Sequence, residues 1–235
     1  MKFGVKIFCD AKFADYFKDK ADFLEVMAIE GKDYSFLKNY PLPIIIHAMH
    51  QGFGTNPADK TLFEKNLTSI NFAISLADRF NAKRIILHLG ILNSENCSIE
   101  QSVSFFQDLD KRIIFENIPL KPSLCSEFSE VEDFISKTGR NFCLDINHAI
   151  QTAGDLKIDF MQSIKGFLEL KPVMYHIGGQ KFEKGDIGHR SFDDSDIPLK
   201  EIFDLLPNDA EITLEVTREI IKTEKDLEFV RSLIT

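Results

Sequence analysis

The chain has 235 residues and a hydrophobic content of 44%, enough for one sizeable core and near the lower size limit of an eight-stranded α/β barrel. Its net charge of −9 disfavours generic nucleic-acid binding, which depends on Lys and Arg. The apolar runs are too short to span a membrane, and Lys6 and Asp10 interrupt the amino-terminal run, so a signal peptide is not expected. The four cysteines form no C-x-x-C pair, which predicts buried thiols in a cytoplasmic protein with no membrane partner.

Eight short apolar runs are expected to form strands. The first two are FGVKIF (residues 3–8) and FLEVMAI (residues 23–29). The six later runs each end on a residue type that binds metals, and these residues are His47, His88, Glu116, Asp145, His176 and Glu215. Because the runs are continuously rich in Ile, Leu, Val and Phe, they are typical of strands that are buried on both faces, as in a parallel sheet.

Helical patterns separate most of these runs. An apolar stripe over residues 63–77 predicts a helix that is capped at Asn56. Capping boxes predict that further helices begin at Ser98 and at Ser129. Another helix is expected over residues 156–170.

The alternation of strands and helices predicts one domain over residues 1–235, folded as a parallel (β/α)8 TIM barrel. The alternative is an open doubly wound sheet, which gathers fewer strand ends at its single binding crevice. In a closed barrel the carboxyl ends of all strands face one mouth. The three histidines and three carboxylates at the ends of the runs would then converge, and this combination of ligands binds divalent metal.

Glu116 is the predicted bridge between two ions. Its neighbours on the adjacent strands would be His88 and Asp145, and adjacent strands lie only ~4.8 Å apart. A carboxylate in that position can be shared by two ions, as two-metal hydrolases require.

Loop residues supply further candidates. His148 lies three residues after Asp145, and the loop that follows His176 contains a D-x-x-H element. The candidate metal ligands outside the strand ends are His148, His189, Asp186 and His50, and the candidate phosphate-binding residues are Arg190, Lys181 and Lys184. For the loop pair and for the three cations, solvated surface charge is the alternative interpretation.

Six elements occur in order along the chain: H at His47, H-L-G from His88, E-N from Glu116, D-x-x-H from Asp145, H at His176 and L-E at Glu215. On these elements the chain resembles the xylose-isomerase-like barrel superfamily, and within it endonuclease IV (AP endonuclease family 2), which cleaves DNA at abasic sites. The resemblance extends over nearly the whole chain. It implies the same barrel and a divalent-metal centre.

The resemblance also implies roles for individual residues. His47 and His88 match ligands of the first zinc in endonuclease IV, Glu116 matches the bridging ligand, and His148 matches a ligand of a third zinc. The core set is shared by the whole superfamily, including its sugar isomerases and epimerases, and consists of Glu116, Asp145, His176 and Glu215. The epimerases also carry a histidine at the position of His148, where it serves the substrate. The chain departs from endonuclease IV in the loop after His176, where D-x-x-H replaces D-x-H and residues 192–196 replace a Gly-rich stretch.

Three functions are compatible with this pattern. The first is a phosphoester hydrolase with two or three zinc ions that acts on abasic DNA, with Glu116 and Glu215 as catalytic residues. The second is an isomerase or epimerase of a sugar or sugar phosphate with a single Mn or Mg ion, in which Glu116 and Glu215 move the proton as general base and acid. The third is a barrel without enzymatic activity, whose strand-end residues are structural.

Overall fold

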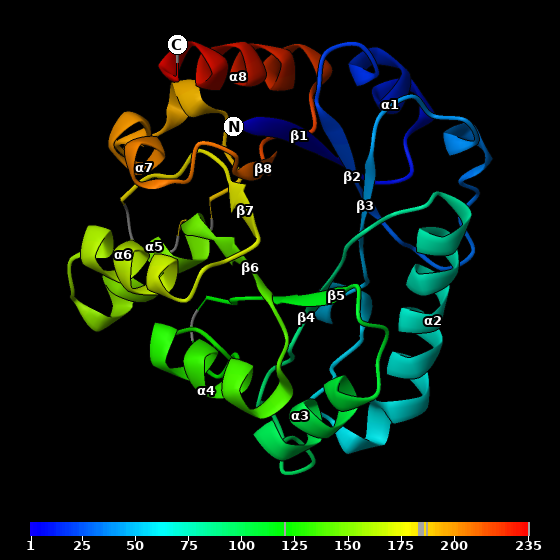
Figure 1. Ribbon diagram of the computed structural model, residues 1–235. Coiled ribbons are helices and arrows are strands. Elements are labelled where there is room, and N and C mark those ends of the chain that lie inside the picture. Colours follow the sequence, from blue (N-terminus) through cyan, green and yellow to red (C-terminus); the bar gives the residue numbers. More distant parts are fainter. Residues whose placement is uncertain (120, 183–185, 187, 235) are drawn as a thin grey trace.

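The computed structural model describes residues 1–119, 121–182, 186 and 188–234, and in it eight parallel strands close into a barrel (Figure 1). The strands are β1 (Lys2–Ile7), β2 (Phe23–Met27), β3 (Ile44–His47), β4 (Ile85–His88), β5 (Ile113–Glu116), β6 (Phe142–Asp145), β7 (Met174–Ile177) and β8 (Glu211–Leu214). Strands that are consecutive in the chain are neighbours, and β8 pairs with β1 to close the ring. The predicted TIM barrel is confirmed, and the open sheet is excluded.

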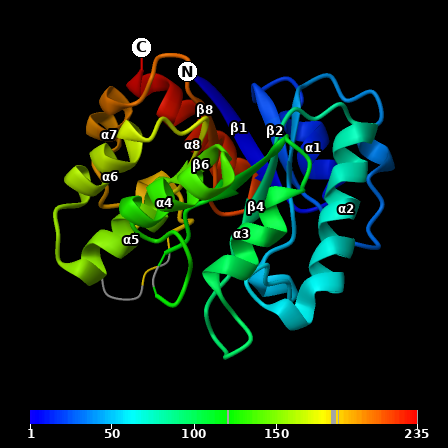
Figure 2. The same ribbon diagram turned by 60° about the horizontal axis from the view of Figure 1, so that its bottom comes forward.

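The helices form an outer ring around the strands (Figure 1). They are α1 (Ala11–Phe17), α2 (Phe63–Arg79), α3 (Ile99–Gln107), α4 (Phe128–Thr138), α5 (Ile146–Leu156), α6 (Phe160–Glu169), α7 (Leu199–Leu205) and α8 (Ile220–Leu233). The connections contain the 3-10 helices η1 (Ser35–Leu37), η2 (Gln51–Phe53), η3 (Lys60–Leu62) and η4 (Phe192–Asp194). Figure 2 shows the ring from another direction, with both termini at one edge. Across the described ranges, no helix has the length and apolarity needed to cross a membrane.

An apolar layer fills the barrel interior beneath the site. It consists of Phe23, Ile45, Ile86, Ile114, Cys143 and Met174. Each of these residues lies two positions before a polar residue near the end of its strand. Because side chains on a strand alternate between faces, those polar residues form the next layer of the same interior, and they are Glu25, His47, His88, Glu116, Asp145 and His176. Gly4 makes this layer possible, because a Cβ atom there would lie 2.2 Å from the ring of Phe23.

Aromatic side chains fill much of the space between the strands and the helices, which accounts for part of the heavy use of phenylalanine. Phe115 on β5 stacks on Phe142 on β6 with ring centroids 5.7 Å apart. Phe134 of α4 meets Phe115 edge-on at 4.9 Å and reaches Phe106 of α3 at 5.4 Å. These contacts hold β5 and β6, which carry Glu116 and Asp145, against the helical ring.

The start of α2 differs from the sequence prediction. The helix begins at Phe63, whereas Asn56 belongs to the preceding loop. The Asn56 side chain donates to the carbonyl oxygen of Ile91 and accepts from the Ile91 N–H, so it joins the loops after β3 and β4. The predicted cap at Ser98 is confirmed, because its hydroxyl accepts from the N–H of Gln101.

Two other helical predictions need correction. The capping box of α4 is formed by Glu127 and Glu130, so the helix does not begin at Ser129. The helix expected over residues 156–170 is α6, which starts only at Phe160, while α5 precedes it without having been predicted. Asp145 explains the omission, because this strand-end residue is also the N-cap of α5.

Candidate metal centre

The strand-end residues meet around Glu116. Its Oε2 atom lies 3.2 Å from His47 Nε2, 3.3 Å from His88 Nε2 and 3.5 Å from His176 Nδ1. These residues come from β3, β4 and β7, and Glu116 itself ends β5. Glu116 and both His47 and His176 are almost fully buried. The closure of the barrel therefore brings together residues that are up to 129 positions apart in the chain.

In the part of the chain that the structure describes, three groups of side chains each bring their ligand atoms within 4.8 Å of one another. The first is His47, His88 and Glu116, and the second is Glu116, Asp145 and His176. These two groups share the Glu116 carboxylate. The third group, Glu25, His176 and Glu215, joins the second through His176. The donor set of imidazole nitrogens and carboxylate oxygens is the one that zinc and similar divalent ions accept.

Two buried atoms of the second group that lack hydrogen-bond partners indicate whether a cation fits there. Asp145 Oδ2 and His176 Nδ1 are both buried and have no hydrogen-bond partner among the described residues. Glu215 Oε1 lies 2.8 Å from His176 Nδ1, but outside hydrogen-bonding geometry. Buried polar atoms without partners are costly, and a bound cation would satisfy both. The residues therefore fit a metal ion.

Each strand-end histidine has one ring nitrogen fixed by an oxygen. His47 Nδ1 lies 2.8 Å from the carbonyl oxygen of Ala48, and His88 Nδ1 lies 3.2 Å from Gln51 Oε1. His176 Nε2 lies 2.8 Å from a Glu25 carboxylate oxygen. When the fixed nitrogen carries the proton, the other nitrogen is left as a lone-pair donor toward Glu116. This pattern orients metal-binding histidines in proteins.

Lys6 and Glu25 belong to the site although sequence reasoning did not select them. Lys6 Nζ lies 2.5 Å from Glu215 Oε1 and 3.3 Å from Glu25 Oε1. Glu25 also accepts a hydrogen bond from the Thr213 hydroxyl at 2.7 Å. The sequence feature that could have identified each of them is a charged residue inside an otherwise apolar strand run. On the neighbouring strands, the metal-ligand residues lie on the same interior face.

Burial and charge set the protonation of the carboxylates. Burial raises the pKa of Glu116, but His88 and His176 outweigh it and hold that pKa well below its ordinary value. Burial acts on Glu215 in the same way, and Lys6 and His176 outweigh it to keep the pKa of Glu215 well below its usual range. Burial, with Glu116 and then Glu215, raises the pKa of Asp145 to about 7. The centre thus concentrates negative charge that favours a cation.

Two asparagines extend the strand ladder beyond the strand ends. The Asn117 amide accepts from the N–H of Asp145 at 2.7 Å and donates to its carbonyl oxygen at 3.0 Å. The Asn147 amide pairs in the same manner with both backbone groups of Gly178, at 2.7 and 3.0 Å. These paired contacts fix the exits of β5, β6 and β7 relative to one another, and so position the ligands on them.

The predicted loop histidines lie at the rim of the site. His148 Nδ1 lies 2.7 Å from the carbonyl oxygen of Asn117, and His189 Nδ1 lies 3.2 Å from that of Glu215. The rings of His148 and His189 are 6.3 Å apart. Neither residue belongs to a three-ligand group within the described ranges, so the third-ion site stays a prediction.

His50 lies over the first group but presents a different chemistry. Its ring stacks on His88 with centroids 4.9 Å apart. Its Nδ1 accepts from the N–H of Gly52 at 3.2 Å. Burial, with His88 and His47 beside it, lowers the pKa of His50 to about 3. A neutral His50 with Nδ1 occupied carries its proton on Nε2, and is therefore a hydrogen-bond donor.

In the loop after β7, the side chains of Lys181 and Arg190 pair with carboxylates of the same loop. Asp186 accepts from the backbone N–H of Lys181 at 2.6 Å and from Arg190 Nε at 2.9 Å. Lys181 also lies 3.2 Å from carboxylate oxygens of Asp194 and Asp196. The structure thus places Asp186 in the loop network and away from the ligand groups found among the described residues. The predicted phosphate contact Lys184 lies outside the described residues.

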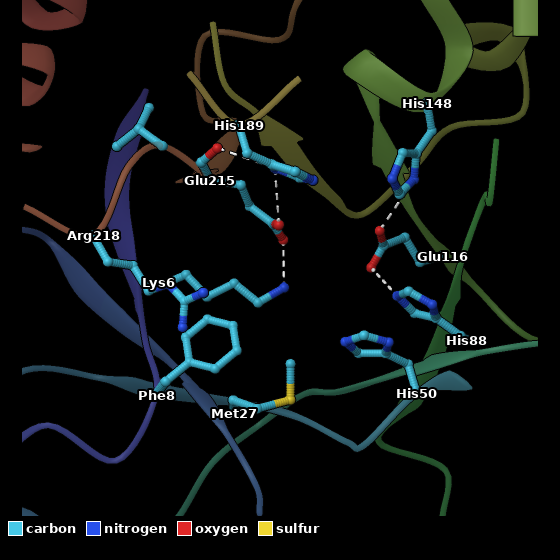
Figure 3. Close-up of a pocket in the computed structure, with 11 residues that line it drawn as sticks. Lys6, Phe8, Met27, His50, His88, Glu116, His148, His189, Glu215 and Arg218 are labelled. Atoms are coloured by element: carbon cyan, nitrogen blue, oxygen red, sulfur yellow. Dashed lines mark hydrogen bonds and ion pairs between the residues drawn. The ribbon is translucent and has the colours of Figure 1, made fainter. Parts of the chain in front are cut away.

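A cavity of about 300 Å³ opens above the ligands (Figure 3). It is lined by Lys6, Phe8, Met27, His50, His88, Glu116, His148, His189, Glu215, Val216 and Arg218. Lining residues thus come from the carboxyl ends of several strands, from the connections that follow β1, β3, β7 and β8, and from the first turn of α5. A small molecule in this cavity can touch the ligand groups directly.

A family model described as a xylose isomerase-like TIM barrel matches residues 34–233. The chain belongs to the xylose isomerase-like TIM barrel family. No curated protein sequence matches it. A D-tagatose 3-epimerase-like protein shares its fold with a TM-score of 0.73 and 17% identity over 100% of both chains. Endonuclease IV from Thermus thermophilus gives 0.72 and 16%, covering 100% of this chain and 99% of that one. An AP endonuclease of family 2 from Brucella melitensis gives 0.72 and 14%, covering 99% of each chain.

These likenesses establish the fold of a xylose isomerase-like barrel and leave its reaction open. Endonuclease and epimerase-like proteins superpose equally well on the chain, with TM-scores of 0.72 and 0.73. The family therefore includes enzymes of different reaction classes on one scaffold, and the assignment of a reaction has to come from the residues of the site.

Zinc binding to this xylose isomerase-like barrel is expected to release protons. Asp145 has its pKa raised to about 7, and it must be ionised to bind an ion. Burial lowers the pKa of His176, but Cys143 and the surrounding carboxylates outweigh it and raise that pKa well above its ordinary value. Apparent affinity should therefore rise with pH, by about tenfold per unit for each proton released.

Calorimetric titrations with zinc, in buffers of different ionisation enthalpy, measure this proton release directly. At a pH of about 6, we expect at least one proton per chain to leave. Release should fall when Asp145 is replaced by asparagine, because that side chain has no proton to lose. Zinc binding with no buffer-dependent heat at this pH would contradict the protonation described here.

Proposed function

We propose that the chain is a divalent-metal-dependent phosphoester hydrolase of the endonuclease IV type. The observation that carries this proposal is the Glu116 carboxylate, which belongs to both the first and the second ligand group described above. A single-metal isomerase needs only the second group, so His47 and His88 would not bind a metal ion in it. We infer that the site takes two zinc ions, and Glu116 would contribute to holding both.

The residues divide into two holding sets. His47, His88 and Glu116 would hold one ion. The other ion would be held by Glu116, Asp145, His176 and Glu215. Ions in such a site supply a water nucleophile of lowered pKa and offset the charge on a phosphoryl group.

Glu215 is placed to handle a proton at the mouth. Its Oε1 atom lies 2.5 Å from Lys6 Nζ and 2.8 Å from His176 Nδ1, whereas Oε2 lies 3.5 Å from His189 Nδ1. The Oε2 atom is therefore less engaged, and the side chain retains 11% exposure against 2% for Glu116. We infer that Glu215 accepts or returns a proton at Oε2, while Lys6 keeps its other oxygen in place.

A second candidate is an isomerase or epimerase of a sugar or sugar phosphate. The observations that favour it are the small cavity, of about 300 Å³, and the pairing of Lys181 and Arg190 with carboxylates of their own loop. It would use the second ligand group with a single Mn or Mg ion, and Glu116 and Glu215 would exchange the substrate proton. Abasic DNA remains the substrate that the resemblance to endonuclease IV suggests for the first candidate.

Turnover of a substrate panel by the zinc-reconstituted protein tests the assignment. The panel comprises bis(4-nitrophenyl) phosphate, an abasic-site duplex, and a ketose with its phosphate ester. We expect cleavage of a phosphodiester that stops after chelation and returns with zinc. Interconversion of the sugar, with both phosphodiesters intact, would replace the hydrolase with the isomerase.

A further inference from the structure

Arg218 and Phe8 form a stacked pair at the rim of the cavity (Figure 3). Phe8 follows β1 directly, and Arg218 lies three residues after Glu215 in the connection that follows β8. Because β1 and β8 are hydrogen-bonded neighbours, the barrel places the two connections side by side. The guanidinium carbon of Arg218 lies 4.0 Å from the centroid of the Phe8 ring.

Within the described ranges, Arg218 forms no ion pair, which distinguishes it from other cations around the mouth. Lys6 lies against Glu25 and Glu215, and Arg190 lies 2.9 Å from Asp186. Stacking on an aromatic ring orients a guanidinium without consuming its N–H donors. The Phe8 ring therefore orients the Arg218 guanidinium, and among the described residues its N–H groups have no hydrogen-bond acceptor.

A second cavity, of about 350 Å³, adjoins the first. Its lining consists of Lys6, Ile7, Phe8, Asp10, Phe13 and Arg218, of which Lys6, Phe8 and Arg218 also line the cavity over the ligands. The carboxylate of Asp10 accepts from the N–H of Phe13 at 3.0 Å and caps α1. The stacked pair thus stands between the space over the ligand groups and a second space that can take another part of a substrate.

We propose that Arg218, held on Phe8, binds a phosphate group of the substrate that is remote from the reacting bond. The substrate is then a small phosphoester that carries a second phosphate, and not duplex DNA. This inference rests on the proposed hydrolase function for the chemistry at the reacting end of the substrate. Of the described lysines and arginines that line the cavity, Lys6 is already paired with carboxylates, so Arg218 provides for one anionic group.

Duplex DNA demands a different surface. Its affinity comes from several Lys and Arg side chains that contact successive phosphates. The chain carries a net charge of −9, and Lys181 and Arg190 are paired with Asp194 and other acids of the same loop. One oriented guanidinium beside a small cavity fits a single phosphate group, which it can bind through two parallel N–H donors.

Calorimetry with inorganic phosphate tests the subsite on the full chain after chelation, so that no metal competes for the anion. We expect wild type to bind one phosphate, and Arg218→Ala to weaken binding by about tenfold or more. Arg218→Lys keeps the charge but loses the planar fork, and should be intermediate. Phe8→Leu should also weaken binding, because the guanidinium loses its support.

The matched control is Arg79→Ala. Arg79 also stacks on a phenylalanine, Phe80, with its guanidinium carbon 5.1 Å from the ring centroid, but it lies at the end of α2 and lines neither cavity. This variant should bind phosphate like wild type. No phosphate binding by wild type, or equal binding by wild type and Arg218→Ala, would overturn the proposal.

The zinc-reconstituted protein separates this proposal from the proposed function. Two 4-nitrophenyl phosphodiesters of a nucleoside are compared, one with an additional terminal phosphate and one without it. Arg218→Ala should raise KM by about tenfold for the first and leave KM for the second unchanged, with kcat preserved. Failure to hydrolyse either ester, with Arg218-dependent phosphate binding intact, would remove the hydrolase and leave the subsite. Equal KM effects on both esters would remove the subsite.

Discussion

Replacing Glu116 by glutamine is expected to cost the protein one bound ion and to lower phosphodiester turnover by about a thousandfold or more. Among the described residues, Glu116 is the only residue common to the first and second ligand groups, and its Oε2 atom lies within 3.5 Å of three imidazole nitrogens. An amide is a much weaker ligand for divalent ions than a carboxylate, and it cannot bridge two of them. Zinc content by mass spectrometry and kcat of the same preparation measure the two effects.

The control for this variant is Glu211→Gln. Glu211 begins β8 at the opposite end of the barrel, where it is paired with Arg84 and Lys2. The substitution removes one carboxylate from an ion pair that lies away from the candidate centre, so zinc content and kcat should match wild type. If Glu116→Gln retained both zinc content and turnover, the bridging role would be wrong.

Replacing Lys6 by methionine is expected to destabilise the metal-free protein by about 3–5 kcal/mol. Lys6 faces Glu25, whose side chain is fully buried, and Glu215, which is 11% exposed. Burial lowers the pKa of Lys6, but Glu215 and Glu25 outweigh it and hold that pKa above its ordinary value, so the side chain is a cation. Removing it leaves two carboxylates in the barrel interior with His176 as the remaining cation beside them, and so uncovers buried negative charge.

Urea unfolding of the chelated protein, followed by circular dichroism, measures this loss. The double variant Lys6→Met and Glu25→Gln should recover much of the free energy of unfolding, because it removes one carboxylate as well. Lys200→Met is the surface control, since Lys200 pairs with Asp204 on the exposed face of α7, and its stability should equal that of wild type. A Lys6→Met protein as stable as wild type would show that the buried charges are balanced by other groups.

The barrel and its ring of ligands could be predicted because both depend on local patterns. An apolar run that ends on His88 or Glu116 is visible in a few letters, and the chirality and closure of a parallel sheet bring such ends to one mouth. In each strand from β3 to β8, such a residue lies at the last position of the strand or next to it. The pairing of β4 with β5 places His88 opposite Glu116, in agreement with the predicted neighbours.

Lys6 and Glu25 could not be assigned in the same way because their partners are distant in the chain. Glu25 contacts His176, 151 positions away, and Thr213, 188 positions away. A charged residue within a strand is a visible signal, but only the closed barrel shows which groups compensate it. The period-two alternation of a strand places Glu25 on the same face as Phe23, so the sequence indicates the face on which Glu25 lies but not the groups that it contacts.

The loops were the least predictable part of the site. Asp145 is both a candidate ligand and the N-cap of α5, so residues after it were interpreted as a loop although they form a helix. Lys181 and Arg190 were candidate phosphate contacts, and the structure pairs both with acids of their own loop. Such pairings depend on the path of a long loop, which hydrophobic periodicity does not specify.

Anomalous diffraction at the zinc edge, from crystals grown with zinc, tests most directly whether Glu116 joins two ion sites at one mouth. The proposed two-ion centre predicts two peaks about 3.5–4 Å apart, on either side of the Glu116 carboxylate. One peak should lie beside His47 and His88, and the other beside Asp145 and His176. A single peak, or peaks that do not contact Glu116, would contradict the two-ion centre.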